Sequence, residues 1–308
     1  MDVAEGPLFV FGDSLSDVGN AWRLLGDGAV PSPPHWRGRR CNGPLWVEIL
    51  AGRLGWPPLE PSLAGGTDHA YGGARSGAGL SPKGVLNLLE QVGRFLESYA
   101  GKPLEAGALV VVRAGANDYL DGEPDWARAE AINANLLAAV SALAEVGARR
   151  FLVPTELPWG VSPIVPPSYG TAQRQAFDAL IGQQNQGLAR ALQDLAQQRG
   201  LQVWQPDFHG LLRAALADPS AYGLVEVVRP ALQEGQAATP ASQVPDASGF
   251  LWWDSRAHFC AAFHQRLADQ ALACLAAAPM AGTTTGVIVP GAGPMAGPTV
   301  SGAGSVGA

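Results

Sequence analysis

Ser14 is the residue of this sequence with the clearest potential for covalent chemistry. It follows an apolar run, residues 8–11, that ends abruptly in the triplet Gly-Asp-Ser. A buried strand that stops at this point would present the serine hydroxyl at its carboxyl end, where open α/β sheets bind their ligands. Ser14 could instead accept a backbone N–H as the N-cap of the next helix. The serine is therefore a candidate nucleophile whose role depends on partners elsewhere in the chain.

A serine nucleophile needs a base within hydrogen-bond distance, a group that orients this base, and donors for the oxyanion. Of the five histidines, His258 is the best candidate base, because it stands near the C-terminus where we expect a helix to begin. Asp254 precedes it by four residues, a spacing that shares one face of a helix and that a turn could also close. His258 could also be an exposed residue in the first turn of that helix.

Further strand-to-loop junctions offer groups that could converge on Ser14. Asn117 follows residues 108–112, an apolar and largely β-branched run that is typical of a strand buried on both faces. Gly73 stands in a glycine-rich loop, where the missing side chain allows a ligand to approach the backbone closely. Either residue could also have a purely local role, Asn117 as a loop cap and Gly73 as a turn glycine.

The segments that would position these residues alternate between strand and helix patterns. Apolar runs typical of buried strands cover residues 8–11, 108–112, 149–154 and 201–204, and helical patterns cover residues 45–54, 85–99, 126–145, 171–199 and 258–275. This alternation predicts a parallel sheet covered by helices on both faces. We therefore expect an α/β protein with one domain, residues 1–278, built as a three-layer α/β/α sandwich with about five parallel strands.

Residues 279–308 differ sharply in composition from this domain. Gly, Ala, Pro, Thr, Val and Ser predominate there, and charged residues are absent. Such a segment cannot form a helix with one clear apolar face, so we expect a flexible C-terminal tail.

The composition argues against several classes of function. The net charge is −7 and no long basic block is present, so we expect no nucleic-acid partner. Arg37, Arg39 and Arg40 form a short basic cluster, which we interpret as a solvated loop face rather than a phosphate site. No apolar run is long enough for a transmembrane segment. The three cysteines show no metal-binding spacing, and no P-loop or dinucleotide fingerprint is present.

The N-terminus does not define the compartment by itself. Residues 1–6 lack the basic and apolar regions of a signal peptide. We therefore expect a cytoplasmic protein if the chain is complete, and a secreted or periplasmic one if a signal peptide has been removed. We also expect a monomer.

Four sequence blocks, in order, resemble those of the GDSL esterases and lipases, also called SGNH hydrolases. The blocks are Phe11-Gly12-Asp13-Ser14-Leu15-Ser16-Asp17, Tyr71-Gly72-Gly73-Ala74-Arg75, Gly115-Ala116-Asn117-Asp118, and Trp253-Asp254 with His258. A single block is unspecific, but four in order form a strong signal. With weaker similarities between the blocks, the resemblance covers about residues 7–275 and implies the flavodoxin-like fold of that family.

The resemblance implies a role for each matched residue. Ser14 would be the nucleophile, His258 the general base, and Asp254 the group that orients the imidazole and stabilises its charged form. The backbone N–H groups of Ser14 and Gly73, with the side-chain amide of Asn117, would form the oxyanion hole.

The last block departs from the family pattern. The family usually has two residues between the last Asp and the His, and this chain has three, residues 255–257. A wider turn could absorb the extra residue. Alternatively, Asp254 does not orient His258, and a Ser14–His258 dyad uses a backbone carbonyl instead.

The predicted function is hydrolysis of carboxylic esters through an acyl-enzyme on Ser14, with a small-molecule ester or lipid as substrate. Short-acyl, lipid and acetyl-sugar esters all occur in the family, and no metal or organic cofactor is implied. Residues 21–40, 160–170 and 222–249 are expected to line the acyl and alcohol sites, with acyl-chain contact from Trp22, Leu24 and Leu25. The alternative is a non-catalytic carbohydrate- or lipid-binding relative of the same fold. It would use tryptophans as platforms, namely Trp22, Trp36, Trp159, Trp252 and Trp253.

Overall fold

Four parallel strands form the central sheet, in the order β1-β2-β3-β4. The computed structural model describes residues 6–99, 102–105, 107–120, 124–166, 168–232 and 244–280. The strands are β1 (Leu8–Gly12), β2 (Leu109–Arg113), β3 (Arg150–Leu152) and β4 (Gln202–Trp204). Every residue of β1 and β2 is buried, which explains why both read as continuous apolar runs rather than as alternating ones.

A further segment, residues 67–71, runs beside the outer edge of β1. Val10 forms a parallel bridge with Asp68, and the N–H of His69 donates to the Val10 carbonyl at 2.7 Å. The pairing is short because the chain turns at Gly65 and Gly66 before it and at Gly72 and Gly73 after it. Among the described residues the sheet therefore has four strands, not the expected five or so. With the extra segment included, the strand order is that of the doubly wound flavodoxin-like fold.

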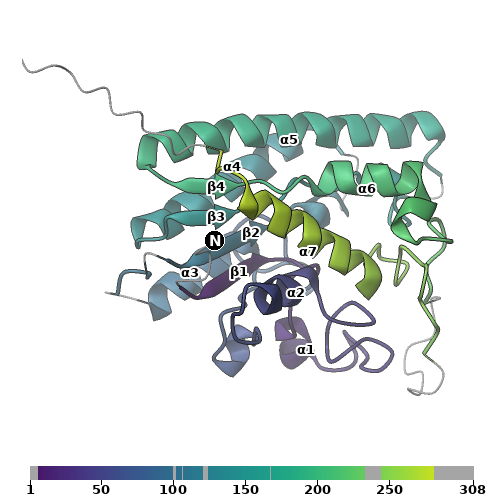
Figure 1. Cartoon of the computed structure of the whole chain (residues 1–308), viewed down its shortest axis with the longest axis horizontal. Coiled ribbons are helices and arrows are strands. Elements are labelled where there is room, and N and C mark those ends of the chain that lie inside the picture. The colour runs from purple at the N-terminus through teal and green to yellow at the C-terminus, as the bar shows by residue number, and fades with distance from the viewer. Residues whose placement is uncertain are drawn as a thin grey trace, which may run out of the picture.

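Helices cover both faces of this sheet (Figure 1). Three helices contact one another in sequence on one face, and two contact α7 on the other. The first set is α3 (Leu88–Ser98), α4 (Trp126–Glu145) and α5 (Thr171–Arg199), and the second is α2 (Trp46–Arg53), α6 (Phe208–Ala217) and α7 (Ala261–Ala276). A short helix, α1 (Asn20–Leu25), follows the serine loop. The predicted three-layer α/β/α fold is confirmed.

Two helices begin and end at the residues that the sequence predicts, because strong local signals mark their ends. Asp125 caps α4 by accepting the N–H of Arg128 at 2.7 Å, and Gly200 ends α5 in a left-handed conformation (φ 64°).

The prediction that His258 begins the closing helix is wrong. Helix α7 starts at Ala261, because the preceding residues, 251–260, fold back in a hydrogen-bonded turn. The N–H of Trp253 donates to the His258 carbonyl at 2.6 Å, and the N–H of Cys260 donates to the Leu251 carbonyl at 3.0 Å. These hydrogen bonds keep His258 out of the helix and direct it back towards the sheet.

At the C-terminal end of the described chain, the N–H of Met280 donates to the Val203 carbonyl of β4 at 2.7 Å. The predicted tail covers residues 279–308, and its part from residue 281 onward lies outside the described residues. Within the part of the chain that the structure describes, no helix combines the length and apolarity needed to cross a membrane.

Candidate active site

Ser14, His258 and Asp254 form one hydrogen-bonded line at the carboxyl end of the sheet. The Nε2 atom of His258 lies 2.9 Å from the Ser14 hydroxyl oxygen. Its Nδ1 atom lies 2.8 Å from both carboxylate oxygens of Asp254. Because a carboxylate can only accept, Nδ1 carries the proton and Nε2 is left to accept from the serine. The fold therefore places a base against a hydroxyl that is 244 positions away in the chain.

The extra residue of the last block is absorbed by a wider turn. Oδ1 of Asp254 accepts the backbone N–H groups of Arg256 (3.0 Å) and His258 (3.3 Å), and Ala257 adopts a positive φ of 62°. This conformation is unfavourable for alanine. The strained turn brings the imidazole onto the carboxylate, so a backbone carbonyl is not needed to orient it.

Asp254 is buried and strongly coupled to its surroundings. Burial by itself raises the pKa of Asp254, but the charge and hydrogen bond of His258, with Arg40 and His35, hold it well below its usual range. The carboxylate is therefore ionised throughout the neutral pH range and can stabilise a positively charged imidazole beside it.

The serine loop is held rigidly at the end of β1. The side-chain amide of Gln91, in α3, forms two hydrogen bonds with the backbone of Gly12. It accepts the Gly12 N–H at 2.9 Å and donates to the Gly12 carbonyl at 2.8 Å. A Cβ atom on Gly12 would lie 2.1 Å from the Arg113 carbonyl oxygen, so only glycine fits this close approach between β1 and β2. Gly12 and Gln91 thus determine where the following Asp13 and Ser14 stand.

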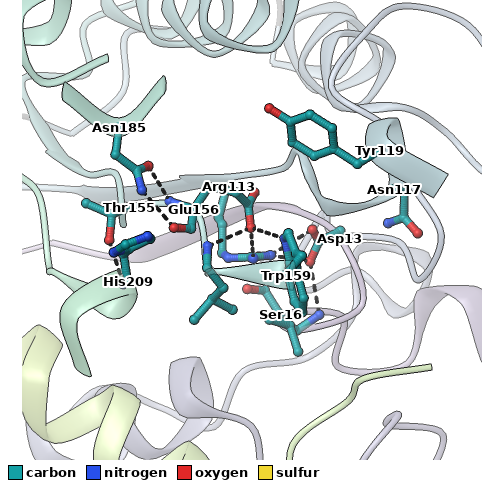
Figure 2. Close-up of polar contacts among 12 residues, drawn as sticks. Asp13, Ser16, Arg113, Asn117, Tyr119, Thr155, Glu156, Trp159, Asn185 and His209 are labelled. Atoms are coloured by element: carbon teal, nitrogen blue, oxygen red, sulfur yellow. Dashed lines mark hydrogen bonds and ion pairs between the residues drawn. The ribbon is translucent and has the colours of Figure 1, made fainter. Parts of the chain in front are cut away.

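A buried ion-pair network joins residues at the ends of three strands, next to the serine loop in the sequence (Figure 2). Arg113, at the end of β2, contacts both carboxylate oxygens of Asp13 at 2.8 and 2.7 Å and the carboxylate of Glu156 at 2.8 Å. Glu156 also accepts the indole N–H of Trp159 at 2.8 Å. Burial raises the pKa of Glu156, and the Arg113 charge opposes this rise. The network fixes the serine loop relative to Trp159, which lines the site.

The glycine loop is tied to the serine loop through Asp17. Its carboxylate accepts the N–H of Gly72 at 2.7 Å and those of Gly19 and Asn20 at 2.8 and 2.6 Å. The next residue, Gly73, has a φ of 95°, a conformation that favours glycine. Asp17 therefore positions the backbone of the glycine loop next to Ser14.

A cavity of about 270 Å³ lies over the serine, with Ser14, Gly73, Asn117 and His258 among its lining residues. The side-chain amide of Asn117 donates one N–H to the Ala74 carbonyl at 2.9 Å, which orients the group and leaves its second N–H for a ligand. The structure thus gathers four of the sequence-predicted residues around one cavity, with Asp254 directly behind His258.

A second, mostly apolar cavity of about 320 Å³ continues from the first. The two share the lining residues Ala116, Trp159 and Ile164, and the second is completed mainly by Tyr119, Val165, Pro166, Tyr169 and Phe177. Half of the residues that line the second cavity come from residues 160–170, one of the predicted specificity loops. Leu24 and Leu25 are exposed and line neither cavity, so the predicted acyl-chain contact is not found there.

Three basic residues also line the first cavity: Arg40, at the end of the predicted specificity loop 21–40, and Lys83 and Arg256, which sequence reasoning did not assign to the site. For Arg40 the interpretation as a solvated loop face is wrong, because the side chain is partly buried in the site. The same interpretation suits the exposed Arg37, whereas Arg39 pairs with Glu48 at 2.8 Å. No local pattern marks Lys83 or Arg256, because only the fold brings their loops to the serine.

Within the described ranges, no group of three or more His, Cys, Asp or Glu side chains is placed to hold a metal ion.

The sequence comparisons identify the family in which this fold and this line of side chains occur. The chain belongs to the GDSL-like lipase/acylhydrolase family, whose model matches residues 8–271. It is 36% identical over 116 residues to a phosphatidylcholine-sterol acyltransferase of Aeromonas hydrophila, a match that covers 37% of this chain and 32% of that protein. It is 26% identical over 276 residues to a GDSL esterase/lipase of Arabidopsis thaliana, covering 72% of this chain and 70% of that one.

The chain therefore spans about a third of the length of the Aeromonas relative. A solved member of the lipolytic G-D-S-L family from Veillonella parvula aligns with a TM-score of 0.42 and 15% identity, over 88% of this chain and 98% of that one.

Proposed function

We propose that this protein hydrolyses carboxylic esters through an acyl-enzyme formed on Ser14. The observation that carries the proposal is the line from Asp254 through His258 to Ser14 at the wall of a cavity. Family membership supports an ester hydrolase, and the geometry supports the particular mechanism.

In the first half of the reaction, the Ser14 oxygen attacks the ester carbonyl carbon while His258 Nε2 takes the hydroxyl proton. The negative charge that develops on the carbonyl oxygen is met by the N–H groups of Ser14, Gly73 and Asn117, which are fixed before the reaction begins. Asp254 stabilises the imidazolium and keeps its orientation. When the intermediate collapses, the bond to the alcohol breaks, and His258 returns the proton to the leaving oxygen.

In the second half, a water molecule attacks the acyl-enzyme, with His258 again taking a proton and then giving it to the Ser14 oxygen. The acid is released and the serine hydroxyl is restored. We assign the acyl group to the second cavity, because its aromatic and aliphatic walls begin at Ala116 and Trp159, which also line the serine cavity.

The experiment that tests this proposal combines hydrolysis of p-nitrophenyl esters, from acetate to laurate, with labelling by a fluorophosphonate probe. We expect ester hydrolysis and labelling in the native protein and neither in Ser14→Ala. Ser248→Ala serves as the control, because Ser248 bonds only to the exposed Asp246 among the described side chains. A folded native protein that neither hydrolyses esters nor takes the label would overturn the proposal and favour the non-catalytic binding relative.

A further inference from the structure

The serine cavity is strongly basic although the protein as a whole is acidic. The chain has a net charge of −7, yet Arg40, Lys83 and Arg256 all line the cavity that contains Ser14. These three residues, hereafter the cationic subsite, come from three loops that are far apart in the sequence. Their convergence concentrates positive charge where an ester substrate would bind.

Asp254 attracts Arg40 and Lys83, but no carboxylate forms an ion pair with the cationic subsite in the part of the chain that the structure describes. Two carboxylates close to Ser14 are already engaged, Asp254 with His258 and Asp13 with Arg113. The ion pairs found among the described residues include none of the three basic side chains. Arg40, Lys83 and Arg256 repel one another, and the carboxylates that attract them, Asp254 and Asp17, are bonded to other groups. A bound anion would relieve this repulsion.

The pKa of Lys83 is consistent with this repulsion between the cations of the subsite. Partial burial of the ammonium group, with the positive charges of Arg40 and Arg256, lowers the pKa of Lys83 to about 8, although Asp254 opposes the shift. An anion between these groups would raise the pKa of Lys83 again, because it stabilises the charged form of the lysine.

The cationic subsite lies close to the reacting atoms. A Cβ atom placed on Gly73 would be 3.2 Å from the Lys83 amine nitrogen, so the ammonium stands beside the predicted oxyanion hole. Arg256 belongs to the turn that joins Asp254 to His258. None of the three cations lines the second, apolar cavity. An ester bound at Ser14 therefore meets an apolar wall in one direction and positive charge in another.

We propose that the cationic subsite binds an anionic group, a phosphate or a carboxylate, on the alcohol part of the substrate. The preferred substrate would then be an ester with an apolar acyl group and a negatively charged alcohol. The two arginines suit this role, because their planar guanidinium groups bind phosphate and carboxylate oxygens in pairs. This inference rests on the proposed ester hydrolysis at Ser14, which it makes more specific.

The test compares three octanoyl esters: 1-octanoylglycerol, its 3-phosphate, and 3-(octanoyloxy)propanoate. The first is neutral and the other two carry a phosphate or a carboxylate, so they distinguish the two anions. We expect kcat/KM to be at least about 10-fold higher for one or both anionic esters, mainly through a lower KM, as charged hydrogen bonds would provide. A ratio of anionic to neutral kcat/KM near or below 1 for both anionic esters would overturn the inference.

Variants identify the source of the preference. In Arg256→Gln and in Lys83→Met we expect the anionic-to-neutral ratio to fall about 10-fold in each. Arg37→Gln is the matched control, because Arg37 is an exposed arginine outside the cavity, and its ratio should equal that of the native protein. An unchanged ratio in both site variants would show that the cationic subsite does not recognise the anion.

Binding to Ser14→Ala separates this inference from the proposed function. Calorimetric titration with 1-octanoylglycerol 3-phosphate and with 1-octanoylglycerol measures the preference without turnover. A protein that hydrolyses neutral esters through Ser14 but binds the two compounds equally retains the proposed function and refutes the anionic subsite. A protein without hydrolysis that still binds the phosphate ester at least 10-fold more tightly refutes the function and retains the subsite.

Discussion

Replacement of Asp254 by asparagine tests the triad most directly. Asp254 has its two carboxylate oxygens 2.8 Å from His258 Nδ1, and Oδ1 also accepts two backbone N–H groups of the turn. Asparagine has nearly the same shape and keeps one oxygen for those N–H groups. Its NH₂ group then faces Nδ1 and can only donate.

The size of the effect follows from this geometry. A donor facing Nδ1 favours the imidazole tautomer that carries its proton on Nε2, which lies 2.9 Å from the Ser14 oxygen. The base is then occupied before the reaction begins, and the charge that stabilises the imidazolium is also lost. In another serine hydrolase this substitution lowers kcat about 10⁴-fold. We expect a decrease in kcat of about 10³- to 10⁴-fold here, equivalent to about 4–5.5 kcal/mol.

The assay is steady-state hydrolysis of a p-nitrophenyl ester, with urea unfolding to verify that Asp254→Asn remains folded. Asp246→Asn is the matched control, because Asp246 is exposed and bonds to Ser248 rather than to a histidine. The control should keep native kcat. A loss of less than about 10-fold in Asp254→Asn would refute the triad and indicate a Ser14–His258 dyad.

Three further predictions concern the oxyanion hole, the buried ion pairs and the pH dependence of stability. Asn117→Ala should lower kcat about 10²- to 10³-fold with a smaller change in KM, because it removes one oxyanion donor; an unchanged kcat would exclude that role. Arg113→Met should lower the free energy of unfolding, measured with urea, by about 3–5 kcal/mol, because Asp13 and Glu156 would be left buried without a counter-charge. A change of less than 1 kcal/mol would contradict the reasoning. Burial lowers the pKa of His264 from 6.5 to about 3. As the pH falls below 6.5, His264 is therefore protonated in the unfolded chain but stays neutral in the folded protein. When the pH is lowered from 7.5 to 5, His264 should therefore reduce the free energy of unfolding by about 2 kcal/mol. A His264→Gln variant should lose correspondingly less over that interval, and an equal loss would show that His264 is not the source.

Much of the fold is determined by local sequence patterns. Strands β1 and β2 are recognisable because burial on both faces requires a continuous apolar run. The bounds of α4 and α5 are recognisable because Asp125 and Gly200 provide capping signals that act over a few residues. These features need no knowledge of distant parts of the chain.

The number of strands and the start of α7 depend on hydrogen bonds that the local apolar pattern does not reveal. Residues 67–71 pair with β1 for too short a stretch to form a full strand, a result set by the flanking glycine turns. His258 lies outside α7 because its carbonyl accepts the N–H of Trp253. In both places the observed backbone hydrogen bonds differ from those that the apolar pattern of the sequence predicts.

For the candidate site, the sequence by itself determined which side chains could react, because Ser14, Asn117 and Gly73 each follow a recognisable strand or glycine loop. Only the tertiary structure decided how Asp254 reaches His258, since the extra residue requires the positive φ of Ala257. The cationic subsite was equally invisible in the sequence. Arg40, Lys83 and Arg256 become neighbours only when three loops meet over the sheet, and electrostatic interactions depend on distance in space rather than on separation along the chain.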